Sequence, residues 1–125
     1  MNHKRPVNLN LATLQFPVMA IASILHRISG IVLFVLFPVM IYFFDMSLKN
    51  AGTFTQLQLW FENNLGCQFI LWVFGAAIFY HFLAGIRHIV MDLGYGESLR
   101  VGRWSAISVI IATIFFILLL GIWIW

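Results

Sequence analysis

The chain has 125 residues, of which 62% are hydrophobic and 9% are charged, and its formal net charge is +3 at pH 7. Soluble domains carry about 25% charged residues, so this chain has too little polar surface to close over a water-soluble core. The composition predicts a single all-α domain whose solvent is the lipid bilayer. The basic residues lie near the ends of apolar stretches, which favours a role in membrane topology and argues against nucleic-acid binding.

Residues 1–19 are predicted to form an arm along the cytoplasmic surface. Apolar residues alternate with polar ones between Pro6 and Pro17, which indicates extended or irregular structure and not a span. Pro17 suits the first turn of a helix, where its missing N–H costs nothing. The basic start is followed by polar, proline-broken sequence, which does not fit a secretory signal. No transit segment precedes the arm, so we expect a bacterial inner membrane.

Three stretches contain no Asp, Glu, Lys or Arg, and each approaches the length of a membrane-spanning helix: residues 28–44, 65–86 and 104–125. A helix of about 20 apolar residues crosses a hydrocarbon core of about 30 Å. The first stretch is slightly short, but it can recruit the residues before it while Arg27 extends toward the headgroups. We therefore predict three spans at about 20–44, 65–88 and 104–125, with a kink at Pro38 in the first.

The two connections between the spans differ in character. The first is predicted to contain a turn at Ala51-Gly52-Thr53 and a short interfacial helix over residues 54–61, where an apolar stripe occurs. The second, residues 92–103, is short and carries three glycines. A short connection makes the second and third spans antiparallel neighbours.

The distribution of Lys and Arg predicts the orientation of the chain. All of them except Lys49 lie in the arm, near the start of the first span, at the end of the second span or in the second connection. The positive-inside rule then places the amino terminus in the cytoplasm and the carboxyl terminus outside. Tryptophans at both ends of the third span, Trp104 and Trp123 with Trp125, fit the two aromatic belts of a membrane.

Three polar residues lie at the start of the first span. Ser23, His26 and Arg27 are spaced i, i+3 and i+4, so they should project from one face of a helix. A quinone would use such groups, because its oxygens accept hydrogen bonds and a fixed cation stabilises its reduced form. Haem propionates would use them too, since guanidinium groups pair with carboxylates. Alternatively, Arg27 is a topology anchor, Ser23 a helix cap and His26 an interface residue.

His81 is the ionisable residue that lies deepest in a predicted span. It precedes Arg87 by six residues, about 9 Å along a helix. Its helix face carries small residues on both sides, which let another backbone or a flat macrocycle come close. This pattern fits a haem ligand, and it also fits a histidine hydrogen-bonded to a neighbouring helix. In the first case the second axial ligand must come from another subunit. The other residues of this face are Phe74, Ala77, Ala84, Gly85 and His88.

His88 and Asp92 are spaced i, i+4 at the cytoplasmic end of the second span. We interpret them first as an interfacial pair, with proton delivery or contact with haem propionates as the alternative. The sequence has no glycine-rich loop followed by Lys, no cysteine pair and no carboxylate dyad. Hydride or flavin chemistry would therefore belong to another chain.

Two stretches of the chain resemble a known family. They are RPVNLNLATLQFPVMAIASILHRIS, residues 5–29, and HFLAGIRHIVMDLG, residues 81–94. Both are similar to the cytochrome b556 membrane-anchor subunits of succinate dehydrogenase, respiratory complex II. The similarity rests on the Arg-Pro of the arm and on Ser23, His26, Arg27, Ser29, His81, Gly85, Ile86, Arg87, His88 and Asp92.

The resemblance implies that the chain is half of a two-subunit haem-binding helical bundle. His81 would be the axial ligand of the haem b iron, with the second axial histidine supplied by the partner anchor. Ser23 and Arg27 match the family's ubiquinone-site positions. His26 and Arg27 match positions near the haem propionates, and His88 is included as a further cofactor contact.

The resemblance also implies an electron-transfer anchor that is catalytic only within a succinate:quinone oxidoreductase of the tricarboxylic acid cycle. Its partners would be a second membrane-anchor subunit, an iron–sulfur subunit and a flavoprotein, as a heterotetramer or a trimer of heterotetramers, with ubiquinone as substrate. Two alternatives remain open. One is the anchor of a quinol:fumarate reductase, and the other is a membrane scaffold whose polar residues only hold helices together.

Overall fold

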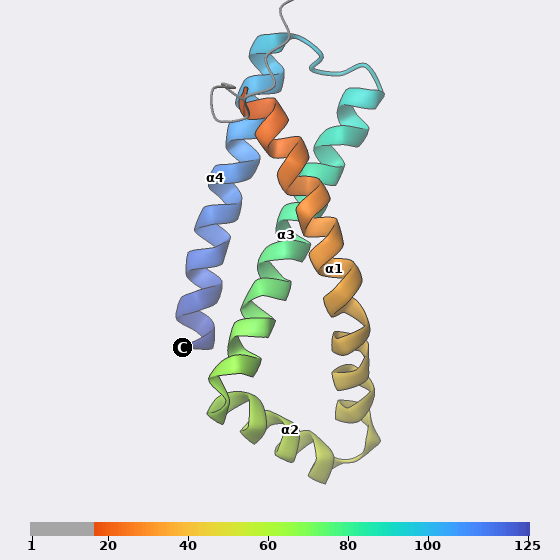
Figure 1. The fold of residues 1–125 in the computed structure, drawn as a ribbon, viewed down its shortest axis with the longest axis vertical. Coiled ribbons are helices and arrows are strands. Elements are labelled where there is room, and N and C mark those ends of the chain that lie inside the picture. The colour runs from red at the N-terminus through yellow and green to blue at the C-terminus, as the bar shows by residue number, and fades with distance from the viewer. Residues whose placement is uncertain (1–16) are drawn as a thin grey trace, which may run out of the picture.

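The computed structural model describes residues 17–125, and within this range the chain forms four helices and no strand. They are α1 (Val18–Lys49), α2 (Ala51–Asn63), α3 (Leu65–Asp92) and α4 (Leu99–Ile124). Helices α1, α3 and α4 are long and apolar enough to cross a membrane, whereas α2 lies across one end of the bundle and joins α1 to α3 (Figure 1). The predicted all-α membrane fold is confirmed. Residues 1–16 of the predicted arm lie outside the described residues.

Polar side chains define where α2, the helix of the first connection, begins. The Asn50 side chain accepts a hydrogen bond from the Thr53 N–H at 2.8 Å, and the Asn50 N–H donates to the Thr53 hydroxyl at 3.3 Å. This reciprocal cap satisfies two N–H groups that a helix start leaves unpaired. The predicted turn at Ala51–Thr53 is therefore wrong, because these residues form the first turn of α2. The predicted interfacial helix is present within α2.

The connection between α3 and α4 is short and turns on two glycines. Gly94 and Gly96 have φ values of +84° and +75°, a region that side chains with a Cβ rarely adopt. The chain thereby reverses direction within a few residues, and α4 returns antiparallel to α3, as predicted (Figure 1). Helix α1 continues unbroken through Pro38.

Helix α3 packs against both α1 and α4. At the contact with α4, the Arg87 guanidinium donates to the Ser105 hydroxyl at 3.0 Å and to the Gly102 carbonyl at 3.1 Å. Nearer the other end, the Trp72 indole N–H donates to the Ile117 carbonyl at 3.0 Å. Arg87 therefore joins two helices, a role beyond the topology anchor expected from the sequence.

Most of the apolar surface of the three long helices stays uncovered by the chain itself. In their most apolar windows, 0% of residues in α1, 11% in α3 and 6% in α4 are buried. Apart from Tyr80, the side chains buried within the described residues are small, such as Ala22 at 2% and Ala84 at 1% exposure. Lipid or another protein must therefore cover the remaining surface.

Tyr80 provides a test of the contact between α1 and α3. Its side chain is 6% exposed, and its hydroxyl donates to the Ala22 carbonyl at 2.7 Å. We expect Tyr80→Phe to destabilise the assembled protein by about 1 kcal/mol, because a buried hydrogen bond is lost. Thermal unfolding in detergent measures this. Tyr42→Phe is the matched control, since Tyr42 is 58% exposed. Equal midpoints for the two variants would contradict the prediction.

Candidate functional site

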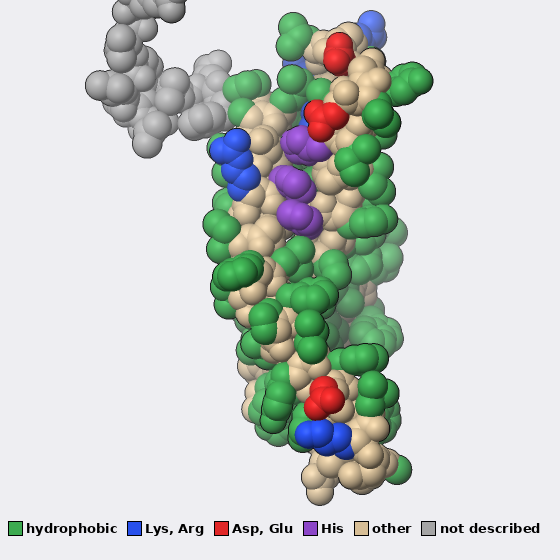
Figure 2. Space-filling view, turned by 90° about the vertical axis from the view of Figure 1, so that its right-hand side faces the viewer, with side chains coloured by type: hydrophobic (Ala, Val, Ile, Leu, Met, Phe, Trp, Pro, Cys, Tyr) green, Lys and Arg blue, Asp and Glu red, His purple; other side chains and the backbone are tan. Residues whose placement is uncertain are grey.

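Three imidazole rings form a stack along the seam between α1 and α3, and we call His26, His81 and His88 the histidine stack. The His26 ring of α1 lies between the two rings of α3. Its centroid is 4.1 Å from that of His81 and 5.0 Å from that of His88, with interplanar angles of 18° and 21°. Figure 2 shows the three rings as a column on one face of the molecule. His81 and His88 are seven residues apart in α3, which explains why they share a helix face.

Small residues let the two helices approach closely at this stack. A Cβ added at Gly30 of α1 would lie 3.2 Å from His81 Cε1, closer than ordinary van der Waals contact. One added at Gly85 of α3 would lie 3.8 Å from His26 Nε2. The predicted face of small residues around His81 is thus present, and in this chain it receives the backbone of α1.

The His81 ring is held through one of its two nitrogens. Nδ1 lies 3.0 Å from the Ser29 hydroxyl oxygen and 3.3 Å from the His26 carbonyl oxygen. Nε2 makes no hydrogen bond within the described residues, and this atom is not buried. The hydrogen-bonded histidine predicted as an alternative is therefore observed, yet the second nitrogen remains free to bind a metal.

The other two rings of the stack have different environments. His88 Nδ1 donates to the Ala84 carbonyl at 2.7 Å, one turn earlier in α3. His26 Nε2 is buried and has no hydrogen-bond partner in the part of the chain that the structure describes. Such an unsatisfied atom costs about 1–3 kcal/mol. The predicted pairing of His88 with Asp92 is wrong: Asp92 is exposed, and within residues 17–125 the ion pair that forms is Lys49 with Asp45.

Ser23 and Arg27 lie beside His26 on α1. Because all three residues belong to one continuous helix, their spacing i, i+3, i+4 places them within an arc of about 100°. Ser23 is half-buried and Arg27 is exposed, and neither makes a hydrogen bond within the described residues. His26 lies at the edge of this arc that contacts α3, and Arg27 lies at the exposed edge.

Sequence reasoning did not identify Ser29 as a site residue, although it lies in the stretch that carries the family resemblance. Ser29 is 6% exposed and contacts both His26 and His81. Its spacing of seven residues from Ala22 places both small residues on one helix face. That spacing was the signal that could have located the contact with α3.

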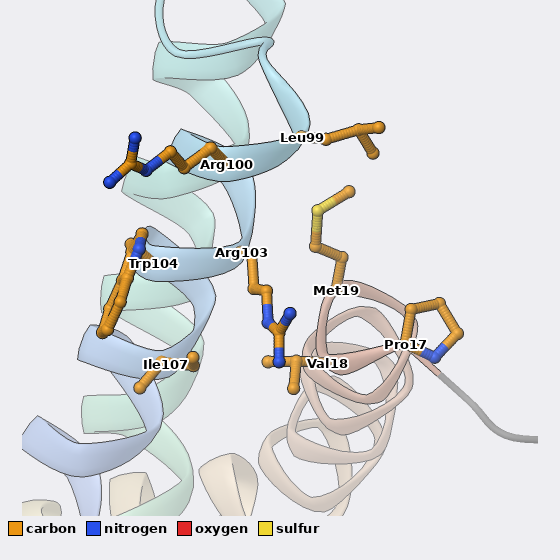
Figure 3. Close-up of a pocket in the computed structure, with 8 residues that line it drawn as sticks. All are labelled: Pro17, Val18, Met19, Leu99, Arg100, Arg103, Trp104 and Ile107. Atoms are coloured by element: carbon orange, nitrogen blue, oxygen red, sulfur yellow. The ribbon is translucent and has the colours of Figure 1, made fainter.

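A separate groove of about 940 Å³ opens between the start of α1 and the start of α4. Two arginines of α4 contribute its positive charge, and Figure 3 shows Arg103 extending toward α1. None of the predicted site residues lines it. Its lining residues are Pro17, Val18, Met19, Leu99, Arg100, Arg103, Trp104 and Ile107.

Comparison with known proteins agrees with the three apolar helices and the polar residues at one end. A family model described as succinate dehydrogenase/fumarate reductase transmembrane subunit matches residues 1–120. The chain belongs to this family. The family resemblance found in the sequence is thereby confirmed.

Relatives named "succinate dehydrogenase cytochrome b556 subunit" cover most or all of the chain. The protein of Coxiella burnetii is 45% identical over 125 residues, which are 100% of both chains. The protein of Rickettsia bellii is 31% identical over 122 residues, 96% of this chain and 93% of the relative. That of Paracoccus denitrificans is 27% identical over 113 residues, 88% and 84%. The chain is therefore a membrane-anchor subunit of a succinate dehydrogenase complex.

Proposed function

We propose that this transmembrane subunit binds haem b through His81 and forms part of a ubiquinone-reduction site. The observation that carries the proposal is the state of His81. Its Nδ1 is held by α1, and its Nε2 has no hydrogen-bond partner among residues 17–125. An imidazole nitrogen that is free and positioned is the usual axial ligand of a b-type haem.

The residues around His81 fit a haem group. Haem b carries two carboxylate side chains, which need cations or hydrogen-bond donors when they enter a membrane. Arg27 is exposed close by on α1, and His26 Nε2 lacks a partner within the described residues. Arg27, His26 and His88 would hold these carboxylates, and His81 would hold the iron together with a histidine of the partner anchor. The haem would supply a group that can store one electron.

Ser23 and Arg27 would bind ubiquinone. They lie one turn apart on α1, where Ser23 is half-buried and Arg27 is exposed, so a ligand or a partner subunit can reach both. The Ser23 hydroxyl would donate a hydrogen bond to a quinone oxygen. The Arg27 guanidinium would stabilise the negative charge that this oxygen gains on reduction, and a low-dielectric surrounding strengthens that effect.

The charged ends of the bundle support an orientation with the site near the cytoplasm. Arg27 lies near the start of α1, Arg87 near the end of α3, and Arg100 and Arg103 at the start of α4, so all four lie at one end of the bundle. Lys49 lies at the other end. By the positive-inside rule, the amino terminus faces the cytoplasm and the carboxyl terminus the periplasm of a bacterial inner membrane.

The uncovered surface supports a multisubunit assembly. We propose that a second anchor subunit covers the seam, and that iron–sulfur and flavoprotein subunits bind at the cytoplasmic end, in a heterotetramer. The relatives named above carry succinate dehydrogenase in their names, which favours succinate oxidation as the direction over fumarate reduction. The enzyme would oxidise succinate in its flavoprotein, and the present chain would serve quinone reduction.

The proposal for His81 predicts the optical spectrum of the complex. We expect His81→Leu to abolish or shift the b-type signal in a reduced-minus-oxidised spectrum of the purified complex, because one axial ligand is lost. Phe82→Leu is the matched control, since Phe82 is the next residue of α3 and is 65% exposed. An unchanged signal in His81→Leu would exclude His81 as a ligand and favour the scaffold alternative.

The proposal for Arg27 predicts a selective kinetic defect. We expect Arg27→Leu to lower ubiquinone reduction about 100-fold, because a charge that stabilises the reduced oxygen is lost. Succinate oxidation with an artificial acceptor should stay near normal, and Arg27→Lys should retain part of the activity.

Arg100→Gln serves as the control for loss of a positive charge at the same end of the bundle. It should leave both assays unchanged. An equal loss in both assays for Arg27→Leu would indicate damaged assembly, and no loss in either would remove Arg27 from the site.

A further inference from the structure

We infer that Ser29 is a positioning residue that sets the tautomer and the ring orientation of His81. The inference rests on the proposed function and deepens it, because it assigns the group that prepares Nε2 to bind iron. Ser29 is 6% exposed and lies on the side of α1 that contacts α3.

The hydrogen bonds of Ser29 determine where the His81 proton lies. The Ser29 hydroxyl donates its one hydrogen to the His26 carbonyl at 2.7 Å. Its oxygen, 3.0 Å from His81 Nδ1, is then left to accept. The second neighbour of Nδ1, the His26 carbonyl at 3.3 Å, can only accept. Both contacts are therefore satisfied when Nδ1 carries the proton, which leaves the lone pair of the neutral ring on Nε2.

The opposite tautomer would break this arrangement. With the proton on Nε2, the Nδ1 lone pair would face the lone pairs of the His26 carbonyl. The Ser29 hydroxyl could turn to donate to Nδ1, but the His26 carbonyl would then lose its side-chain donor. A protonated Nε2 also has no lone pair for a metal. Ser29 thus favours the tautomer that can bind iron.

Ser29 acts together with two packing contacts that fix the plane of the ring. The His26 ring stacks on one side of His81 at 4.1 Å, and the absence of a side chain at Gly30 leaves room for His81 Cε1. A hydrogen bond in the ring plane supplies the orientation that stacking alone does not give. Partners of this kind also raise the basicity of the ligand nitrogen.

The test uses the assembled complex carrying Ser29→Ala, with Ser47→Ala as the matched control. Ser47 lies in the same helix and also donates to a carbonyl three residues earlier, Phe44, at 2.6 Å, but it is only half-buried and lies near the other end of α1. We expect Ser29→Ala to retain haem about tenfold less well when apomyoglobin competes for it. The midpoint potential of the remaining haem should rise, because a less basic imidazole stabilises the oxidised iron less. Its oxidised electron paramagnetic resonance spectrum should shift, since that spectrum depends on the axial ring planes.

A second variant keeps the test informative if Ser29→Ala fails to assemble. Ser29→Cys preserves the volume but offers a weaker acceptor, and it should fall between the natural protein and Ser29→Ala in all three readouts. Succinate oxidation with an artificial acceptor checks that the complex is intact. Normal haem retention, potential and resonance spectrum in both variants would overturn the role of Ser29.

The His81→Leu spectrum separates this outcome from failure of the proposed function. If His81→Leu loses the haem signal while the Ser29 variants behave like the natural protein, Ser29 alone is excluded. If His81→Leu keeps the signal, both the ligand assignment and the role of Ser29 are overturned.

Discussion

The close approach of α1 to α3 is the constraint on which the rest of the structure depends. Alanines, glycines and one serine line this contact, and they let the two backbones come near enough for side chains of one helix to reach carbonyls of the other. The Tyr80 hydroxyl reaches Ala22, and His81 reaches Ser29 and His26. Larger residues at Ala22, Gly30 or Ala84 would separate the helices and remove these bonds together.

Several polar side chains in the long helices donate hydrogen bonds to backbone carbonyls, and side chains that do not are found at the proposed site. In a membrane the cost of an unpaired polar group is high, and Trp72, Tyr80 and Thr113 each donate to a backbone carbonyl. Exceptions within the described residues include Ser23 and Arg27, which make no hydrogen bond there, and His26 Nε2, which is buried without a partner. These three residues lie close together near the start of α1, so the groups that would satisfy them must converge on this part of the helix.

Periodicity and charge were sufficient to predict the three spans, the antiparallel α3 and α4, and the face of small residues around His81. They failed for the contacts that individual side chains make. The pair of His88 and Asp92 looked favourable at i, i+4, but the His88 ring bonds to Ala84 instead. The role of Ser29 could not be predicted from its neighbours, because it depends on His81, which lies 52 residues away in the sequence. Asn50 and Thr53 could have predicted the start of α2, since their spacing is that of a capping box.

About two turns of α1 carry both the groups that pack against α3 and those assigned to quinone. Ala22, His26 and Ser29 pack against α3, where Ser29 and the His26 carbonyl hold the ring of His81. Ser23 and Arg27 each follow a residue of this contact by one position, a rotation of about 100°. On the proposed assignment, Ser23 would contact only quinone and His81 only the haem iron, whereas Arg27 would serve both ligands. Haem and quinone would therefore bind beside each other on the same stretch of α1 and share one side chain.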